Sequence, residues 1–460
     1  MNIIPTDFSD LNLGYLVIPS LFIGYFLGVN FYLVGLYLDY LFKIYYHLNS
    51  SLDRMIYRLL FGATTVAVIV ALLKLVGFDN YVNYFCWALV FINLIFSIYP
   101  TSAKLVFSSV TSNLGELKHL ENMEKVLLSI FLIYFIFSTP NVQFIRESGV
   151  ESFFTHDLFH QANTFSISIF PSLPLESIIL GYFYYFFGAL YYLISYSFLR
   201  FFFSRRVSII GILAIITNWN LIKLVYGDFS VYATSIYLIA FLWSIIWVNI
   251  SKSYRTNLFF GMVLVLSSHH PTQISISLLL IGLLSIFLTS NMRTKWAKIQ
   301  SLKYMSLGLF LTLFFIFNDF SELEAFTFQS EFSLSFNLFF KKAFNIISFV
   351  GLPIFIYFFI ESKLTSRKRY YSFLNLPNQL MFSVFYTLAI LLLSDFGNHF
   401  DIFAYIYFII VLICLPALEL VLNALGQFHP KKNLIFFLYI LFTILDSHFE
   451  SRVKTFFSLF

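Results

Sequence analysis

Long apolar runs alternate with short polar stretches along the whole chain. A helix needs about 20 apolar residues to cross a bilayer, and about fourteen runs approach that length. They lie at roughly 13–35, 57–77, 81–99, 125–140, 176–199, 207–225, 230–250, 257–268, 272–290, 304–318, 343–360, 379–394, 401–424 and 433–447. The alternation typical of an outer-membrane barrel strand is not visible. The pattern predicts an all-α, polytopic integral membrane protein with about 14 transmembrane helices.

Composition supports this fold class. Hydrophobic residues make up 59% of the chain and charged residues only 11%, whereas soluble domains carry about 25% charged residues. Cys86 and Cys414, the two cysteines, both lie in apolar runs, which excludes a disulfide framework and a cysteine-based zinc site. The sequence contains no Walker loop and no GxGxxG motif leading into a helix. We therefore expect no intrinsic ATPase, and we assign the net charge of +5 to membrane topology rather than to a nucleic-acid partner.

Lysine and arginine residues concentrate in every second predicted loop, beginning with the loop that contains Lys43. Basic loops stay on the cytoplasmic side of a membrane, so the pattern predicts that both termini lie outside. Heavy use of Phe, Ile and Asn is typical of an AT-rich bacterial genome. We expect a multi-pass protein of the bacterial cytoplasmic membrane. It would form one membrane domain over 1–460, with extra N-terminal spans in 1–125, a long outer loop at 140–175 and the remaining spans in 176–460.

Six of the nine histidines fall on the predicted outer side. Acidic residues there are partly the complement of basic loops inside, but histidines are mostly neutral near pH 7 and escape that explanation. The six are His156, His160, His269, His270, His399 and His448. Their clustering indicates a polar outer cavity.

The predicted 140–175 loop contains His156, Asp157 and His160 close together. In a helix, His156 and His160 would be i, i+4 neighbours, with Asp157 on an adjoining face. Phe153, Phe154, Phe159 and Phe165 would let the segment lie at the membrane boundary. A carboxylate held there is placed as a general base requires. The alternative is a solvated loop in which Asp157 only caps a helix.

The motif Asp157-Leu-Phe-His160, followed by Pro174 and a Tyr/Phe-rich span, resembles the first catalytic outer loop of multi-spanning glycosyltransferases of the GT-C class. The resemblance covers about 60 residues, roughly 140–200, and is closest to uncharacterised bacterial members. It implies a sugar donor linked to polyprenyl phosphate and an acceptor on the outer face. By this resemblance Asp157 would deprotonate the acceptor hydroxyl, and His160 would be a neighbouring polar residue of the catalytic loop.

Further residues are candidates for substrate binding. Lys223 or Arg146 would contact the lipid phosphate, since Lys and Arg are its usual partners; the alternative for Lys223 is a pair with Asp228, or snorkelling to the interface. We expect headgroup or acceptor contacts from residues in outer turns, together with His156 of the long loop. These residues are His269, His270, Asp395 and His399. The sequence pattern requires no cofactor. A divalent-metal site with mixed N/O ligands is nevertheless possible, and its candidate ligands are Asp157, His160, His269, Asp395, His399 and Asp401.

Two other classes remain open. A polysaccharide polymerase or ligase has a similar span count. Family resemblance implies that such proteins rely on arginines in large outer loops, and the outer loops predicted here hold almost none beyond Arg146 and Arg452. A transporter would leave ionisable residues near the bilayer midplane; Asp39, Lys74 and Glu419 are the candidates. The expected partners are a lipid-linked sugar donor and membrane lipid.

Overall fold

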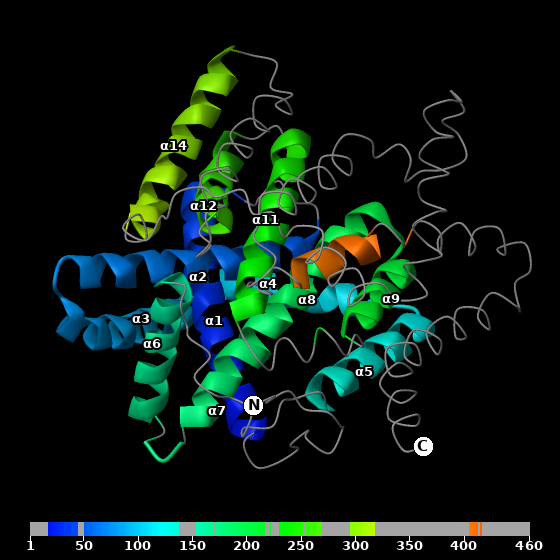
Figure 1. The fold of residues 1–460 in the computed structure, drawn as a ribbon, viewed down its shortest axis with the longest axis horizontal. Helices are drawn as coiled ribbons and strands as arrows, with labels where there is room; N and C mark the ends of the chain where they lie inside the picture. Colours follow the sequence, from blue (N-terminus) through cyan, green and yellow to red (C-terminus); the bar gives the residue numbers. More distant parts are fainter. Residues whose placement is uncertain are drawn as a thin grey trace, which may run out of the picture.

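The computed structural model describes residues 17–44, 50–137, 153–169, 171–173, 175–216, 221, 230–251, 254–268, 295–317, 404–412 and 415. These residues form helices joined by turns and short extended pieces, with no strand among them (Figure 1). The helices are α1 (Val17–Phe42), α2 (Ser51–Leu75), η2 (Asp79–Tyr81), α3 (Val82–Ile98), α4 (Pro100–Lys118), α5 (Asn122–Phe137), α6 (Phe153–Ile169), α7 (Leu175–Ile179), η4 (Leu180–Phe187), α8 (Gly188–Phe202), α9 (Arg205–Ile216), α11 (Ser230–Ser251), η5 (Tyr254–Thr256), α12 (Asn257–Ser268) and α14 (Lys295–Phe317). The all-helical fold class is thereby confirmed for the described part of the chain.

Helices α1 and α2 cross at a point where two glycines let the backbones touch. A Cβ atom on Gly35 would overlap the carbonyl of Arg58, and one on Gly62 would overlap the carbonyl of Phe31. Close approach through small residues is typical of packed membrane helices, because van der Waals contact rather than hydrophobic burial drives association in lipid.

A buried ion pair lies beside this crossing. The Arg58 guanidinium donates from Nε to Asp39 Oδ2 at 2.7 Å, and Asp39 is completely buried. We predicted that the first span ends near residue 35, but α1 continues to Phe42. In these additional turns Arg58 neutralises the Asp39 carboxylate, which would otherwise be too costly to bury. Asp39 is therefore a paired residue in the described structure, one turn before the helix ends.

Helix α4 occupies a segment that the sequence pattern left as a basic loop. Its serine-rich sequence has too little apolar character to predict a span, yet it packs against α2 and α3. Ser109 of α4 accepts a hydrogen bond from Arg58 Nη1 at 3.1 Å and is also bonded to the Tyr32 hydroxyl. Polar contacts to the buried ion pair thus fix α4 against the first two helices.

The predicted aromatic span after Pro174 is continuous through α7, η4 and α8. Its middle part, η4, is a π-helix of eight residues, all of them buried. Gly181 of η4 lies against α1, where an added Cβ would come 2.5 Å from the carbonyl of Ser20. Ser20 Oγ also donates to the carbonyl of Ser177 at 3.0 Å. Small residues therefore bring the aromatic span directly against α1.

Several helix ends that the charge pattern assigns to one side meet in space. Arg206 pairs with Glu121, so the loop before α5 meets the start of α9. Other contacts link residues in or beside the first four predicted basic loops: Arg255 Nη1 to Phe42 O (3.3 Å), Ser51 Oγ to Ser112 O (3.3 Å), Ser197 Oγ to Asp53 Oδ1 (2.5 Å), and Arg205 Nη1 to His119 O (3.1 Å). The predicted grouping of these loops is consistent with their contacts.

Four helical segments in the described part of the chain are long and apolar enough to cross a membrane. They are Ile18–Phe42, Ser51–Leu75, Asp79–Ile98 and Ser177–Phe202. Helices α11 and α12 also coincide with predicted spans, and α14 begins nine residues before its predicted span at roughly 304–318. The predicted spans at 272–290, 343–360, 379–394 and 433–447 lie outside the described residues.

Candidate functional site

Helix α6 carries the predicted catalytic positions, and one side of it is anchored in the protein. Leu158, Gln161, Ala162, Phe165 and Ser166 are all buried. At 100° per residue these positions form one continuous stripe along the helix. The stripe packs against α1, α2 and α3, beside which α6 lies in Figure 1. The segment that the sequence placed in an outer loop is therefore a helix held by the bundle.

Phe165 corrects one expectation. We predicted that it would face lipid at the membrane boundary, but it is only 1% exposed. Its ring makes edge contacts with Phe26 of α1, at 5.7 Å between centroids, and with Trp87 of α3, at 5.9 Å. The prediction failed because an apolar residue suits a protein interior as well as lipid, and its sequence position cannot separate the two.

Positions 156 and 160 lie one helical turn apart on the side of α6 opposite the buried stripe. Ile167, two turns beyond position 160 on that side, is 54% exposed. Position 157 lies on the flank between the two sides, in register with the exposed Ser168. The helix therefore places all three candidate positions away from its anchored stripe.

Two amide side chains, those of Gln161 and Asn163, lie within three residues after position 160. Gln161 is completely buried, next to the Cys86 thiol of α3. Neither of its amide atoms has a nitrogen or oxygen hydrogen-bond partner among the residues that the structure describes, and the same holds for Asn163 Oδ1. A buried polar atom without a partner costs about 1–3 kcal/mol. A bound water or ligand beside α6 would remove that cost.

The remaining candidate residues belong to other segments of the chain. Arg146, Lys223, His269, His270, Asp395 and His399 lie outside the described residues. Within the described ranges no three His, Cys, Asp or Glu side chains come together as a metal site.

Sequence reasoning missed a second set of buried polar contacts. Trp243 Nε1 of α11 donates to Ser197 Oγ at 2.8 Å, and Ser197 Oγ donates to Asp53 Oδ1 at 2.5 Å. These two hydrogen bonds join α2, α8 and α11, which are far apart in the sequence. In the sequence Asp53 is an ordinary residue of a predicted loop and Trp243 an ordinary residue of a predicted span. Only the three-dimensional structure shows that Ser197 links them. We regard it as a structural link between helices.

The long apolar helices, with glycine-mediated crossings and paired internal charges, define an α-helical membrane protein. No family model, no curated protein and no solved structure matches the chain.

Proposed function

We propose that this protein is a membrane glycosyltransferase. It would move a sugar from a polyprenyl-phosphate carrier to an acceptor on the outer face of a bacterial cytoplasmic membrane, which about fourteen spans would cross. The observation that carries the proposal is the form of α6. Its buried stripe anchors the helix, and its opposite side and flank hold positions 156, 157 and 160. On the same helix, the Gln161 amide and Asn163 Oδ1 have no nitrogen or oxygen hydrogen-bond partner among the described residues.

The proposed chemistry needs one positioned carboxylate. Asp157 would accept the proton of the acceptor hydroxyl, whose oxygen would then form a bond to the anomeric carbon of the sugar. The bond from that carbon to the carrier phosphate would break, and the lipid phosphate would leave with the electron pair. The activated carrier replaces a nucleotide, so this reaction is compatible with a chain that lacks a nucleotide-binding motif.

The roles of the other candidates follow from their chemistry. His160 and His156 would bind the acceptor or the sugar, because a neutral imidazole both donates and accepts hydrogen bonds. Arg146 or Lys223 would hold the carrier phosphate. His269, His270, Asp395 and His399 would complete the polar cavity.

The direct test is sugar transfer by the purified full-length protein in lipid, with a radiolabelled polyprenyl-phosphate sugar as donor. We expect Asp157→Asn to lower turnover by about 10²–10⁴-fold, the usual contribution of a general base. Ser168→Ala is the matched control, since Ser168 is an exposed residue of the same helix. It should leave turnover unchanged. Equal turnover by wild type and Asp157→Asn would show that Asp157 is not the general base. The absence of any sugar transfer by the wild-type protein would contradict the proposed transferase activity.

A further inference from the structure

A second feature lies between α5, α8 and α9, away from α6. These helices enclose a cavity of about 310 Å³, within the range of roughly 300–1,000 Å³ typical of ligand pockets. Each helix contributes residues at helical spacing, for example Leu128 and Leu132 from α5, Leu193 from α8, and Ile209 from α9. The cavity is therefore a groove that follows the helices and has almost entirely apolar walls.

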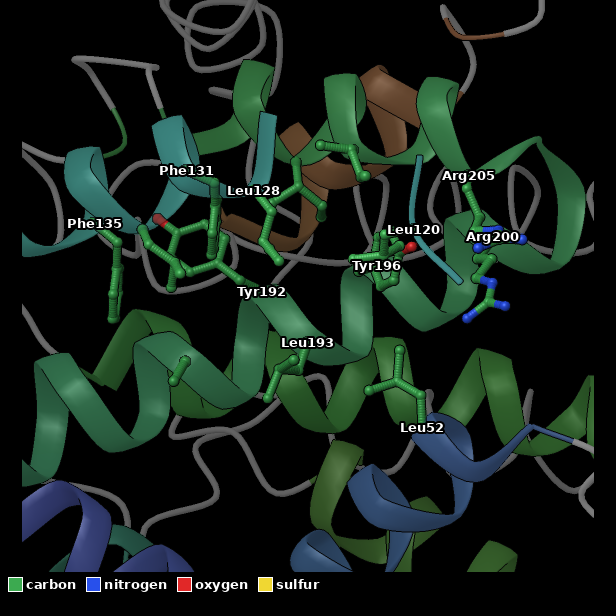
Figure 2. A pocket seen from close by; sticks show the side chains of 14 residues that line it. Leu52, Leu120, Leu128, Phe131, Phe135, Tyr192, Leu193, Tyr196, Arg200 and Arg205 are labelled. Atoms are coloured by element: carbon green, nitrogen blue, oxygen red, sulfur yellow. The ribbon is translucent and has the colours of Figure 1, made fainter. Parts of the chain in front are cut away.

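Among the described residues that line the groove, the charged ones, Arg200 and Arg205, lie at one end. Figure 2 shows Arg200 and Arg205 together at one end, while Phe135 and Tyr192 lie toward the other. Arg200 is the last residue of α8 that lines the groove, and Arg205 is the first residue of α9 that does so. Because a tight turn connects the two helices, both guanidinium groups lie at the same end of the groove. A molecule that fits must be apolar along its length and anionic at one tip.

The length of the groove indicates the kind of molecule. Its lining on α8 runs from Ala189 to Arg200, which corresponds to about 16 Å of helix. One leaflet of a bilayer has a hydrocarbon layer of about 15 Å, half of the usual 30 Å. Leu132 at the edge of the groove is 48% exposed, so a chain could enter from the side.

The charged end suits a phosphate. The Arg205 side chain is 38% exposed, and its Nη1 donates to the carbonyl of His119 at 3.1 Å and lies 3.8 Å from Glu124 Oε2. Both contacts use the same nitrogen of a guanidinium that has five N–H donors. Arg200 adds a second guanidinium at this end. Arginine forks match phosphate oxygens in geometry as well as charge.

From this geometry we propose that the groove binds a phospholipid with an anionic headgroup, whose phosphate lies at Arg200 and Arg205 and whose hydrocarbon chain lies along α5 and α8. Both arginines belong to a loop that the charge pattern places in the cytoplasm, where anionic lipids attract basic residues. The site is thus separate from the proposed transfer site at α6 and does not depend on that function.

The test uses the full chain in nanodiscs of phosphatidylcholine with a minor fraction of phosphatidylglycerol, and native mass spectrometry to identify retained lipids. We expect wild type to retain phosphatidylglycerol selectively, and Arg200→Gln with Arg205→Gln to lower that retention by about tenfold, since charge-assisted phosphate contacts are lost. Arg206→Gln is the control, because Arg206 pairs with Glu121 and does not line the groove. It should retain the lipid.

A second pair of variants tests the apolar part. Leu132→Trp would fill the groove from its exposed edge, whereas Ile133→Trp alters a neighbouring residue that is 57% exposed and does not line it. We expect only Leu132→Trp to lose phosphatidylglycerol. The proposal would be overturned if both variants retain it equally, if phosphatidylcholine is retained as strongly, or if inorganic phosphate alone displaces the lipid, since the site would then recognise free phosphate.

Discussion

The Asp39–Arg58 pair shows how single residues make this fold possible. A buried carboxylate in an apolar helix is costly unless it is paired and hydrogen-bonded. Here Arg58 contacts Asp39 through Nε and Nη2, both at 2.7 Å, and reaches Ser109 of α4 through Nη1. One arginine therefore joins three helices. The sequence marks Asp39 as an unusual charge near a span, but Arg58 is indistinguishable from the other basic loop residues, and no signal pairs the two.

Breaking this pair from one side should destabilise the protein more than removing it entirely. Arg58→Leu removes the guanidinium that neutralises the buried Asp39 carboxylate, and we expect a loss of about 3–5 kcal/mol of stability. Asp39→Leu combined with Arg58→Leu removes both charges and should recover much of that loss. Thermal unfolding of the detergent-purified variants, followed by size-exclusion chromatography, measures the difference. A double variant no more stable than Arg58→Leu would show that the pair is not the source of the effect.

At the scale of helices, the predicted and observed helix bounds agree where a long apolar run alone determines the helix. Helices α3 and α12 end within a residue or two of their predicted bounds. Helix α4 was missed because nothing in its serine-rich sequence predicts the partners that hold it. The groove between α5, α8 and α9 was missed for a related reason: each lining face is an ordinary apolar stripe until three helices are brought together.

The crossing of α1 and α2 gives a prediction at this scale. Gly35→Ala would place a methyl group on the Arg58 carbonyl, and because backbone cannot move aside like a side chain, we expect a loss of at least about 1–3 kcal/mol. Gly115→Ala in α4 is the control, since its added Cβ would meet nothing within 4 Å. It should be neutral or stabilise the helix by up to about 1 kcal/mol. Thermal unfolding of the two variants under the same condition measures the difference. Equal unfolding midpoints for Gly35→Ala and Gly115→Ala would contradict the close crossing of α1 and α2.

At the scale of the whole molecule, some helix ends that the charge pattern grouped together lie close to one another among the described residues. Arg206 and Glu121, and likewise Arg255 and Phe42, join loops that positive residues alone assigned to one side. The candidate site was anticipated less completely. The helical register of positions 156, 157 and 160 followed from the sequence, but the anchoring by Gln161 and Phe165 did not, because burial depends on helices α1 and α3 that are distant in sequence.

An outer transfer site at α6 and a cytoplasmic lipid site at Arg200 and Arg205 require that the basic helix ends and the α6–α7 turn face opposite sides of the membrane. Single cysteines would be introduced at His119 and Glu121 near the basic ends, and at Asp79 and Ser172 in the predicted outer turns, with Cys86 and Cys414 replaced by Ala. All four positions are exposed. A membrane-impermeant maleimide should label positions 79 and 172 in intact cells, and positions 119 and 121 only in inside-out vesicles. Labelling of positions 172 and 119 from the same side would contradict this two-sided arrangement.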